Sequence, residues 1–168
     1  SVFGRTAIPV HLPIGAEKEF NGIVDLVRMK SCTYTRDGDG QGKEGEIPAA
    51  LADAAQAAHE ALVEMVAEGN DKLLEEFFET GTLPVEHIVD GLRDAVRQRR
   101  MFPVLCASGL HNLGSDLIFN FAIDYFPDPA ERGPWKGTLH GAEVSRAVKD
   151  SEPVSAFVFK TIADPFSG

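Results

Sequence analysis

The sequence has few cysteines, few basic residues and no long apolar segment. Its two cysteines, Cys32 and Cys106, lie far apart in apolar runs, which favours a reducing cytoplasmic compartment over a disulfide-stabilised secreted protein. No apolar run approaches the roughly 20 residues of a membrane-spanning helix, and the first residues do not read as a signal peptide. The 26 acidic residues outnumber the 16 basic ones, so the chain lacks the clustered cations with which a protein wraps nucleic acid. The net charge of -10 predicts protein partners, basic ones in particular.

Several catalytic patterns are missing as well. There is no phosphate-binding loop of the form GxxxxGK followed by Ser or Thr, and no GxSxG nucleophile elbow. The five histidines are scattered, without the spacing of a zinc site. We therefore predict no catalytic residue and no metal site in this chain.

One glycine-rich segment imitates two known ligand loops. Residues 40–45 spell the dinucleotide fingerprint, but acidic side chains surround them and would repel a pyrophosphate. The segment from Asp37 also resembles the front half of a calcium loop, yet Pro48 stands where the final bidentate Glu is needed. We interpret residues 37–45 as a flexible surface loop.

The remaining pattern predicts a mixed α/β chain. Strands are expected in residues 7–15 and 20–35, the latter as two strands that either pair as a hairpin around Lys30–Ser31 or are separated by a bulge. Helices are expected over 48–68, 71–79 and 84–99. The apolar run 102–106 predicts a strand buried on both faces. A helix is expected from about Ser115, as N-cap, with Leu117, Ile118, Phe121 and Tyr125 as its buried stripe. Residues 128–152 are typical of a linker, and 154–162 of one more strand.

Acidic residues concentrate on the first two predicted helices. Glu60, Glu64 and Glu68 follow one another at four-residue steps, with Asp71 next, and like charges at this spacing destabilise a helix. Two interpretations stay open. These side chains form either a solvated face, with pairing to Arg93, Arg97 and Arg100 as one option, or a docking ridge for a basic partner.

Segments along nearly the whole chain resemble elongation factor G, a translational GTPase. Residues 13–17 and 20–26 are similar to the entry into its G′ insertion, and 103–109 to the strand and loop of its fifth GTPase motif. Asn112, Gly114, 124–125 and Pro127 continue the match, and 152–153, 159–160 and 164–168 resemble the start of its second domain. Residues 107–113 depart from the family's usual Gly-Ser-Ala-Phe-Lys-Asn-Lys, so a divergent elongation factor G-like paralogue is an alternative.

The resemblance implies a domain plan. Residues 1–15 would be a strand region of the GTPase domain, 16–100 the α+β G′ insertion, and 101–127 the last strand, fifth motif and helix. A linker over 128–153 would lead to residues 154–168, the truncated first strand of a β-barrel. The fold class is then the C-terminal part of an α/β P-loop GTPase, with an insertion and the start of a barrel.

The resemblance also implies a function. The intact parent would bind GTP or GDP with Mg²⁺ and hydrolyse GTP on the ribosome, moving tRNA and mRNA, whereas this chain would be inactive alone. Ser108, Gly109 and Leu110 would line the guanine base, and Glu64, Glu68 and Asp71 would dock the C-terminal domain of the ribosomal stalk protein. Two alternatives stay open. One is a related GTPase of ribosome recycling, release or protection, and the other is a stand-alone protein-binding adaptor.

Overall fold

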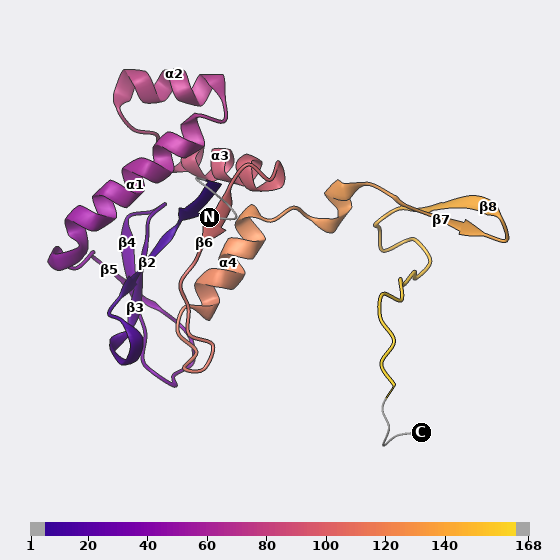
Figure 1. Cartoon of the computed structure of the whole chain (residues 1–168), viewed down its shortest axis with the longest axis horizontal. Coiled ribbons are helices and arrows are strands. Elements are labelled where there is room, and N and C mark those ends of the chain that lie inside the picture. The colour runs from indigo at the N-terminus through magenta and orange to yellow at the C-terminus, as the bar shows by residue number, and fades with distance from the viewer. Residues whose placement is uncertain (1–5, 164–168) are drawn as a thin grey trace. The chain divides into compact units, whose positions relative to one another are not determined.

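Two short strands from distant parts of the sequence pair in parallel in the computed structural model, which describes residues 6–163. They are β1 (Ala7–Pro9) and β6 (Phe102–Val104), with Ile8 opposite Pro103. The sequence between them forms a second sheet and three α-helices (Figure 1). The chain as a whole is mixed α/β and divides into two units, one ending at Phe126 and the other beginning at Pro127.

The second sheet is antiparallel and has four strands in the order β2-β3-β4-β5. They are β2 (His11–Ile14), β3 (Gly22–Asp25), β4 (Lys30–Thr33) and β5 (Lys43–Gly45). The hairpin predicted around Lys30–Ser31 turns earlier, because Asp25 pairs with Lys30. The Asp25 carboxylate accepts the Val27 and Arg28 backbone N–H groups at 2.8 and 3.1 Å, which closes the turn there.

The strand expected over 7–15 is two strands that belong to different sheets. Val10 is the junction: its N–H donates to the Val104 carbonyl at 3.0 Å, and its carbonyl accepts from the Leu26 N–H at 3.0 Å. β2 therefore pairs with β3 and not with the parallel pair. Residues 1–5 of the expected strand region lie outside the described residues.

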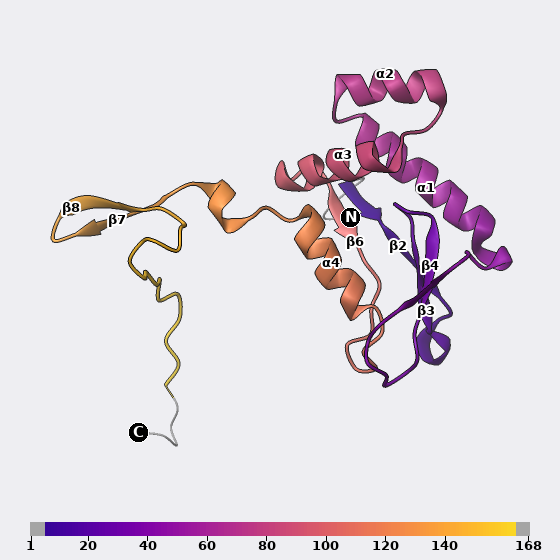
Figure 2. The ribbon, with the colours of Figure 1, turned by 180° about the vertical axis from the view of Figure 1, so that it is seen from behind.

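The three helices predicted between residues 48 and 99 are confirmed with small shifts at their ends. They are α1 (Ala52–Ala67), preceded by a 3-10 turn over Ala49–Leu51, α2 (Asp71–Thr80) and α3 (Val85–Arg97). Leu62, Ile88 and Leu92 are fully buried, as their helical spacing predicts. Seen from behind, α2 is the helix that lies beyond α1 and α3, away from the sheet (Figure 2).

Neighbouring residues of β3 face two different cores, as the alternation of a strand requires. Val24 belongs to the larger core, which the three helices and α4 (Ser115–Tyr125) share. Ile23 belongs to a smaller core with Tyr34 and Leu113. The smaller core joins the four-stranded sheet to the segment after β6, where the candidate guanine site lies.

The prediction of a strand buried on both faces at 102–106 is wrong for the described residues. Phe102 and Val104 are 41% and 47% exposed, because β6 pairs with β1 and one face of this two-stranded sheet is uncovered among the described residues. In α4 the stripe is also narrower than expected, since Phe121 and Tyr125 are buried but Ile118 is exposed.

In the second unit the expected linker contains a hairpin. A 3-10 turn over Pro129–Arg132 precedes β7 (Trp135–Leu139) and β8 (Ala142–Arg146). His140 and Gly141 have φ of 51° and 81°, the left-handed pair of a tight hairpin turn. The strand predicted over 154–162 is not formed, because no neighbouring strand among the described residues satisfies its backbone groups. Residues 164–168 lie outside the described residues.

Candidate functional site

The loop after β6 is the first candidate site. Residues 105–114 connect β6 to α4, and the loop closes on itself through two hydrogen bonds. The Ser108 N–H donates to the Leu113 carbonyl at 2.9 Å, and the Leu113 N–H donates to the Ser108 carbonyl at 3.0 Å. Leu113 is buried in the smaller core, whereas Leu110 is 86% exposed at the loop tip. Gly109 and Leu110 therefore lie at an exposed tip, and half-buried Ser108 belongs to the bridge that anchors its base.

The end of this loop depends on Gly114. Its φ is +77°, and an added Cβ would collide with the Ile23 side chain and come within 3.0 Å of the Cys106 carbonyl oxygen. Only glycine combines that backbone conformation with such a close approach. Gly114 is also the N-cap residue of α4, so the prediction of Ser115 as N-cap is wrong: Ser115 is the first helical residue.

A second loop, residues 36–42, is bonded to the first. The Asp37 N–H donates to the His111 carbonyl at 3.2 Å, and His111 Nδ1 lies 2.9 Å from Asp37 Oδ1. On the other side of the imidazole, Arg36 Nη1 lies 3.1 Å from Nε2. Gly40, at φ +79°, is buried against Asn112. The interpretation of residues 37–45 as a flexible surface loop is therefore wrong in part: Lys43–Gly45 form strand β5, and Asp37 and Gly40 are held against the candidate site.

Asp116, in the first turn of α4, connects this helix to the second loop and to Tyr34. Its Oδ1 accepts hydrogen bonds from the Tyr34 hydroxyl and its own helix's Leu117 N–H, both at 2.8 Å, and its Oδ2 accepts from the Gly42 N–H at 3.1 Å. Burial raises the pKa of Tyr34, and the bonds to Cys32 and Asp116 add to that rise, so the hydroxyl stays a donor. Sequence reasoning missed this role of Asp116, because no sequence signal indicates that Tyr34 comes near.

A cavity of about 360 Å³ lies between the sheet and α4. His11 and Tyr125 line it, and the His11 Nδ1 and Tyr125 hydroxyl atoms are buried without a hydrogen-bond partner among the described residues. Burial lowers the pKa of His11, although Asp25 and Asp116 act in the opposite direction. Burial raises the pKa of Tyr125 to about 12. Both side chains are therefore neutral at pH 7.

The acidic residues of α1 form the second candidate site. Glu60, Glu64 and Glu68 are exposed, and the last turn of α1 contains no basic residue. Glu64 and Glu68 lie at the C-terminal end of α1, where the helix dipole is negative and disfavours carboxylates. Asp71 differs, because it begins α2 behind the Asn70 N-cap, where a carboxylate is favourable.

The arginines proposed as partners for these carboxylates have other contacts. Arg93 donates to the Asp124 carbonyl at 2.6 Å and to Asp90 at 2.9 Å. Arg100 donates to the Gln98 side chain at 2.9 Å. Neither Arg93 nor Arg100 forms an ion pair with Glu60, Glu64 or Glu68.

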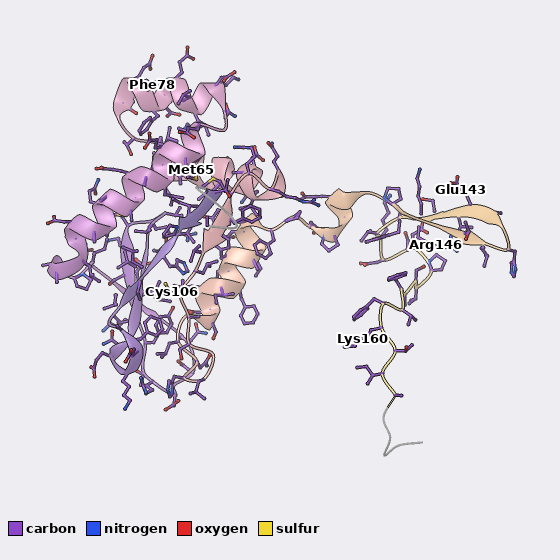
Figure 3. The ribbon with its side chains drawn as sticks, in the orientation of Figure 1. Met65, Phe78, Cys106, Glu143, Arg146 and Lys160 are labelled. Atoms are coloured by element: carbon purple, nitrogen blue, oxygen red, sulfur yellow. The ribbon has the colours of Figure 1, made fainter. Side chains whose placement is uncertain are left out.

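A surface groove of about 750 Å³ adjoins the acidic residues. Apolar side chains, among them Met29 and Phe77, line it together with polar ones that include Glu60 and Glu64. Phe78, on the neighbouring helix α2, is 77% exposed (Figure 3). This part of the molecule thus combines negative charge with accessible apolar surface.

Neither a group of metal ligands nor a membrane-spanning helix occurs among the described residues. Within residues 6–163, no three His, Cys, Asp or Glu side chains are grouped so as to hold a metal ion. In the same range, every helix is too short or too polar to span a membrane.

Comparison with known proteins gives a structural neighbour and no family. No family model matches the chain. A solved structure, described as the crystal structure of ttk003000868 from Thermus thermophilus, matches with a TM-score of 0.66 and 26% sequence identity. The match covers 77% of this chain and 20% of the Thermus chain, so this chain spans about a fifth of the length of that neighbour.

Proposed function

We propose that this chain is part of a translational GTPase similar to elongation factor G, and that it docks a basic ribosomal protein through the end of α1. The parent would bind GTP with Mg²⁺, hydrolyse it on the ribosome and promote movement of tRNA and mRNA. The chain itself would contribute guanine contact and docking, and no catalytic group. Support comes from the segments that resemble the family and from a fold in which an α+β insertion separates two paired parallel strands.

The observation that carries the docking role is the position of Glu64 and Glu68. Both carboxylates lie at the end of α1 where the helix dipole opposes them, and Glu60 adds like-charge repulsion one turn earlier. The Arg100 guanidinium lies against Gly69, just beyond Glu68, but it forms no ion pair with Glu64 or Glu68. An oppositely charged partner offsets this cost and raises the rate of encounter. The adjoining groove with Ala61 and Phe77 offers such a partner apolar contact.

The guanine role is supported by the position of the 108–110 tip. Ligands of parallel α/β sheets bind beyond the carboxyl ends of the strands, and the loop leaves the carboxyl end of β6. Its accessible backbone at Gly109 and Leu110 suits a donor to the guanine carbonyl oxygen.

A titration followed by NMR tests the docking role. The ¹⁵N-labelled chain is mixed with the C-terminal domain of a ribosomal stalk protein at low and at moderate salt. We expect shifts concentrated on residues 60–71, with binding that weakens as salt rises. The double variant Glu64→Lys/Glu68→Lys should bind about tenfold more weakly, because two attractions become repulsions.

The matched control reverses two charges elsewhere. Glu143→Lys/Asp150→Lys changes the net charge equally at exposed positions of the second unit, and should retain binding. Equal weakening of binding in both double variants would show that only the net charge matters, and would refute docking at Glu64 and Glu68. Titration with GDP, with ADP as control, tests the tip separately: shifts at 108–110 that occur equally with both nucleotides would contradict guanine recognition.

A further inference from the structure

Two loops that lie far apart in the sequence are bonded along their lengths. From residues 36–42 come Asp37, whose N–H donates to the His111 carbonyl, and Gly42, whose N–H donates to Asp116. From the other loop, the Asn112 side chain lies against Gly40 so closely that a Cβ there would come within 2.5 Å of Asn112 Nδ2. His111 and Asn112 lie within the segment that the Ser108–Leu113 bridge closes, and Asp116 lies after it, so the contacts fall on both sides of Leu113.

The Asp116 carboxylate holds the base of the candidate site from one end. Both of its oxygens are used, and two of the three donors, the Tyr34 hydroxyl and the Gly42 N–H, belong to the β4–β5 region. Hydrogen bonds to an ionised carboxylate are about twice as strong as neutral ones. Tyr34 also packs beside Leu113 in the smaller core, so polar and apolar contacts act on the same segment.

His111 holds the other end, and its partners determine its tautomer. Arg36 has no acceptor on its guanidinium, so Nε2 must accept the Arg36 hydrogen bond and the proton lies on Nδ1, which donates to Asp37. The imidazole thus links Arg36 and Asp37 of one loop to the other loop.

We propose that residues 36–42 form a clamp that sets the conformation of the 108–114 loop, with His111 and Asp116 as positioning residues. The clamp makes the accessible tip at Gly109 and Leu110 dependent on the four-stranded sheet. That its ligand is a guanine base rests on the proposed function, whereas the clamp itself does not.

Hydrogen exchange of the full chain tests the clamp. The reporters are the Ser108 and Leu113 N–H groups, which close the loop, and the Leu26 N–H, bonded to Val10, reports on the fold. Tyr34→Phe removes one donor to Asp116, and Asp116→Asn replaces the acceptor of the Gly42 N–H. Each should raise exchange at Ser108 and Leu113 by about tenfold or more, the value of a hydrogen bond to a charged group, and leave Leu26 unchanged.

Tyr125→Phe is the matched control, because it removes the same atom from a hydroxyl that has no partner among the described residues. It should leave the exchange rates at Ser108, Leu113 and Leu26 unchanged. Unchanged exchange in Tyr34→Phe and Asp116→Asn would overturn the clamp. So would acceleration that is equal at Leu26, because the two residues would then act on overall stability.

A substitution at His111 tests the other end of the clamp. His111→Ala removes the side-chain contacts with Arg36 and Asp37 and should raise exchange at Ser108 and Leu113 while leaving Leu26 unchanged. His140→Ala, which changes an exposed histidine in the β7–β8 turn, should leave exchange at all three N–H groups unchanged. Unchanged exchange in His111→Ala would refute the role of His111. None of these measurements uses a nucleotide, so a failed GDP titration leaves the clamp standing and contradicts only the proposed ligand.

Discussion

Replacing Gly40 by alanine should destabilise the first unit by about 2–4 kcal/mol. The φ of +79° costs an alanine about 1–2 kcal/mol, of which about 0.4–1 kcal/mol is offset because alanine has fewer unfolded conformations. The new Cβ would lie 2.5 Å from Asn112 Nδ2 and 2.9 Å from Asn112 Cγ. Overpacking of this kind costs about 1–3 kcal/mol more.

Urea unfolding at pH 7 measures the effect, and Gly81→Ala supplies the control. Gly81 has φ +76°, but a Cβ there meets nothing within 4 Å, so its variant should lose only about 1 kcal/mol. The difference between the two variants isolates the contact with Asn112. The double variant Gly40→Ala/Asn112→Gly should recover that difference, since glycine also suits the φ of 52° at position 112. Equal losses in Gly40→Ala and Gly81→Ala would refute the packing of the two loops.

Two pairs of variants test the core and the buried His11. Leu92→Ala should lower the free energy of unfolding by about 2–5 kcal/mol, because Leu92 is fully buried. Leu110→Ala at the exposed tip should change it by less than about 0.5 kcal/mol, and similar values for the two variants would contradict the assigned core. Burial lowers the pKa of His11 below the ordinary value of 6.5, so the unfolded chain binds its proton first, and stability present above pH 6.5 falls as the pH decreases toward the folded-state pKa. His11→Gln should flatten this dependence and His140→Gln should not, as urea midpoints between pH 7.5 and 5 would show.

The helices and their buried faces followed from the sequence because they depend on local spacing. The three- and four-residue steps of α1 and α3 are visible in any window of a dozen residues, and they placed Leu62, Ile88 and Leu92 correctly in the core. The β3–β4 hairpin was also expected, but its turn was placed too late. The deciding bonds, from Val27 and Arg28 to Asp25, depend on a side chain that reads equally well as part of a strand.

What the sequence could not provide were contacts between distant segments. Two loops must fold together before Tyr34 bonds to Asp116 and Gly40 approaches Asn112. Neither contact can be predicted from the spacing of apolar residues. The acidic residues Glu60, Glu64 and Glu68 are the opposite case: their spacing is visible in the sequence, and the structure adds where α1 ends. That end gives Glu64 and Glu68 an energetic cost that composition alone does not reveal.

The junction at Val10 has a consequence for the order of folding. The β3–β4 hairpin and the three helices make mostly local contacts, which form early because they close short loops. Pairing of β1 with β6 must bring together residues 7–9 and 102–104, and in a disordered chain that closure would be slow. If the β3–β4 hairpin and β2 form first, however, the Val10 carbonyl is already held by Leu26, and the Val10 N–H is positioned to donate to Val104. We therefore expect β6 to assemble late, on a segment that is already folded.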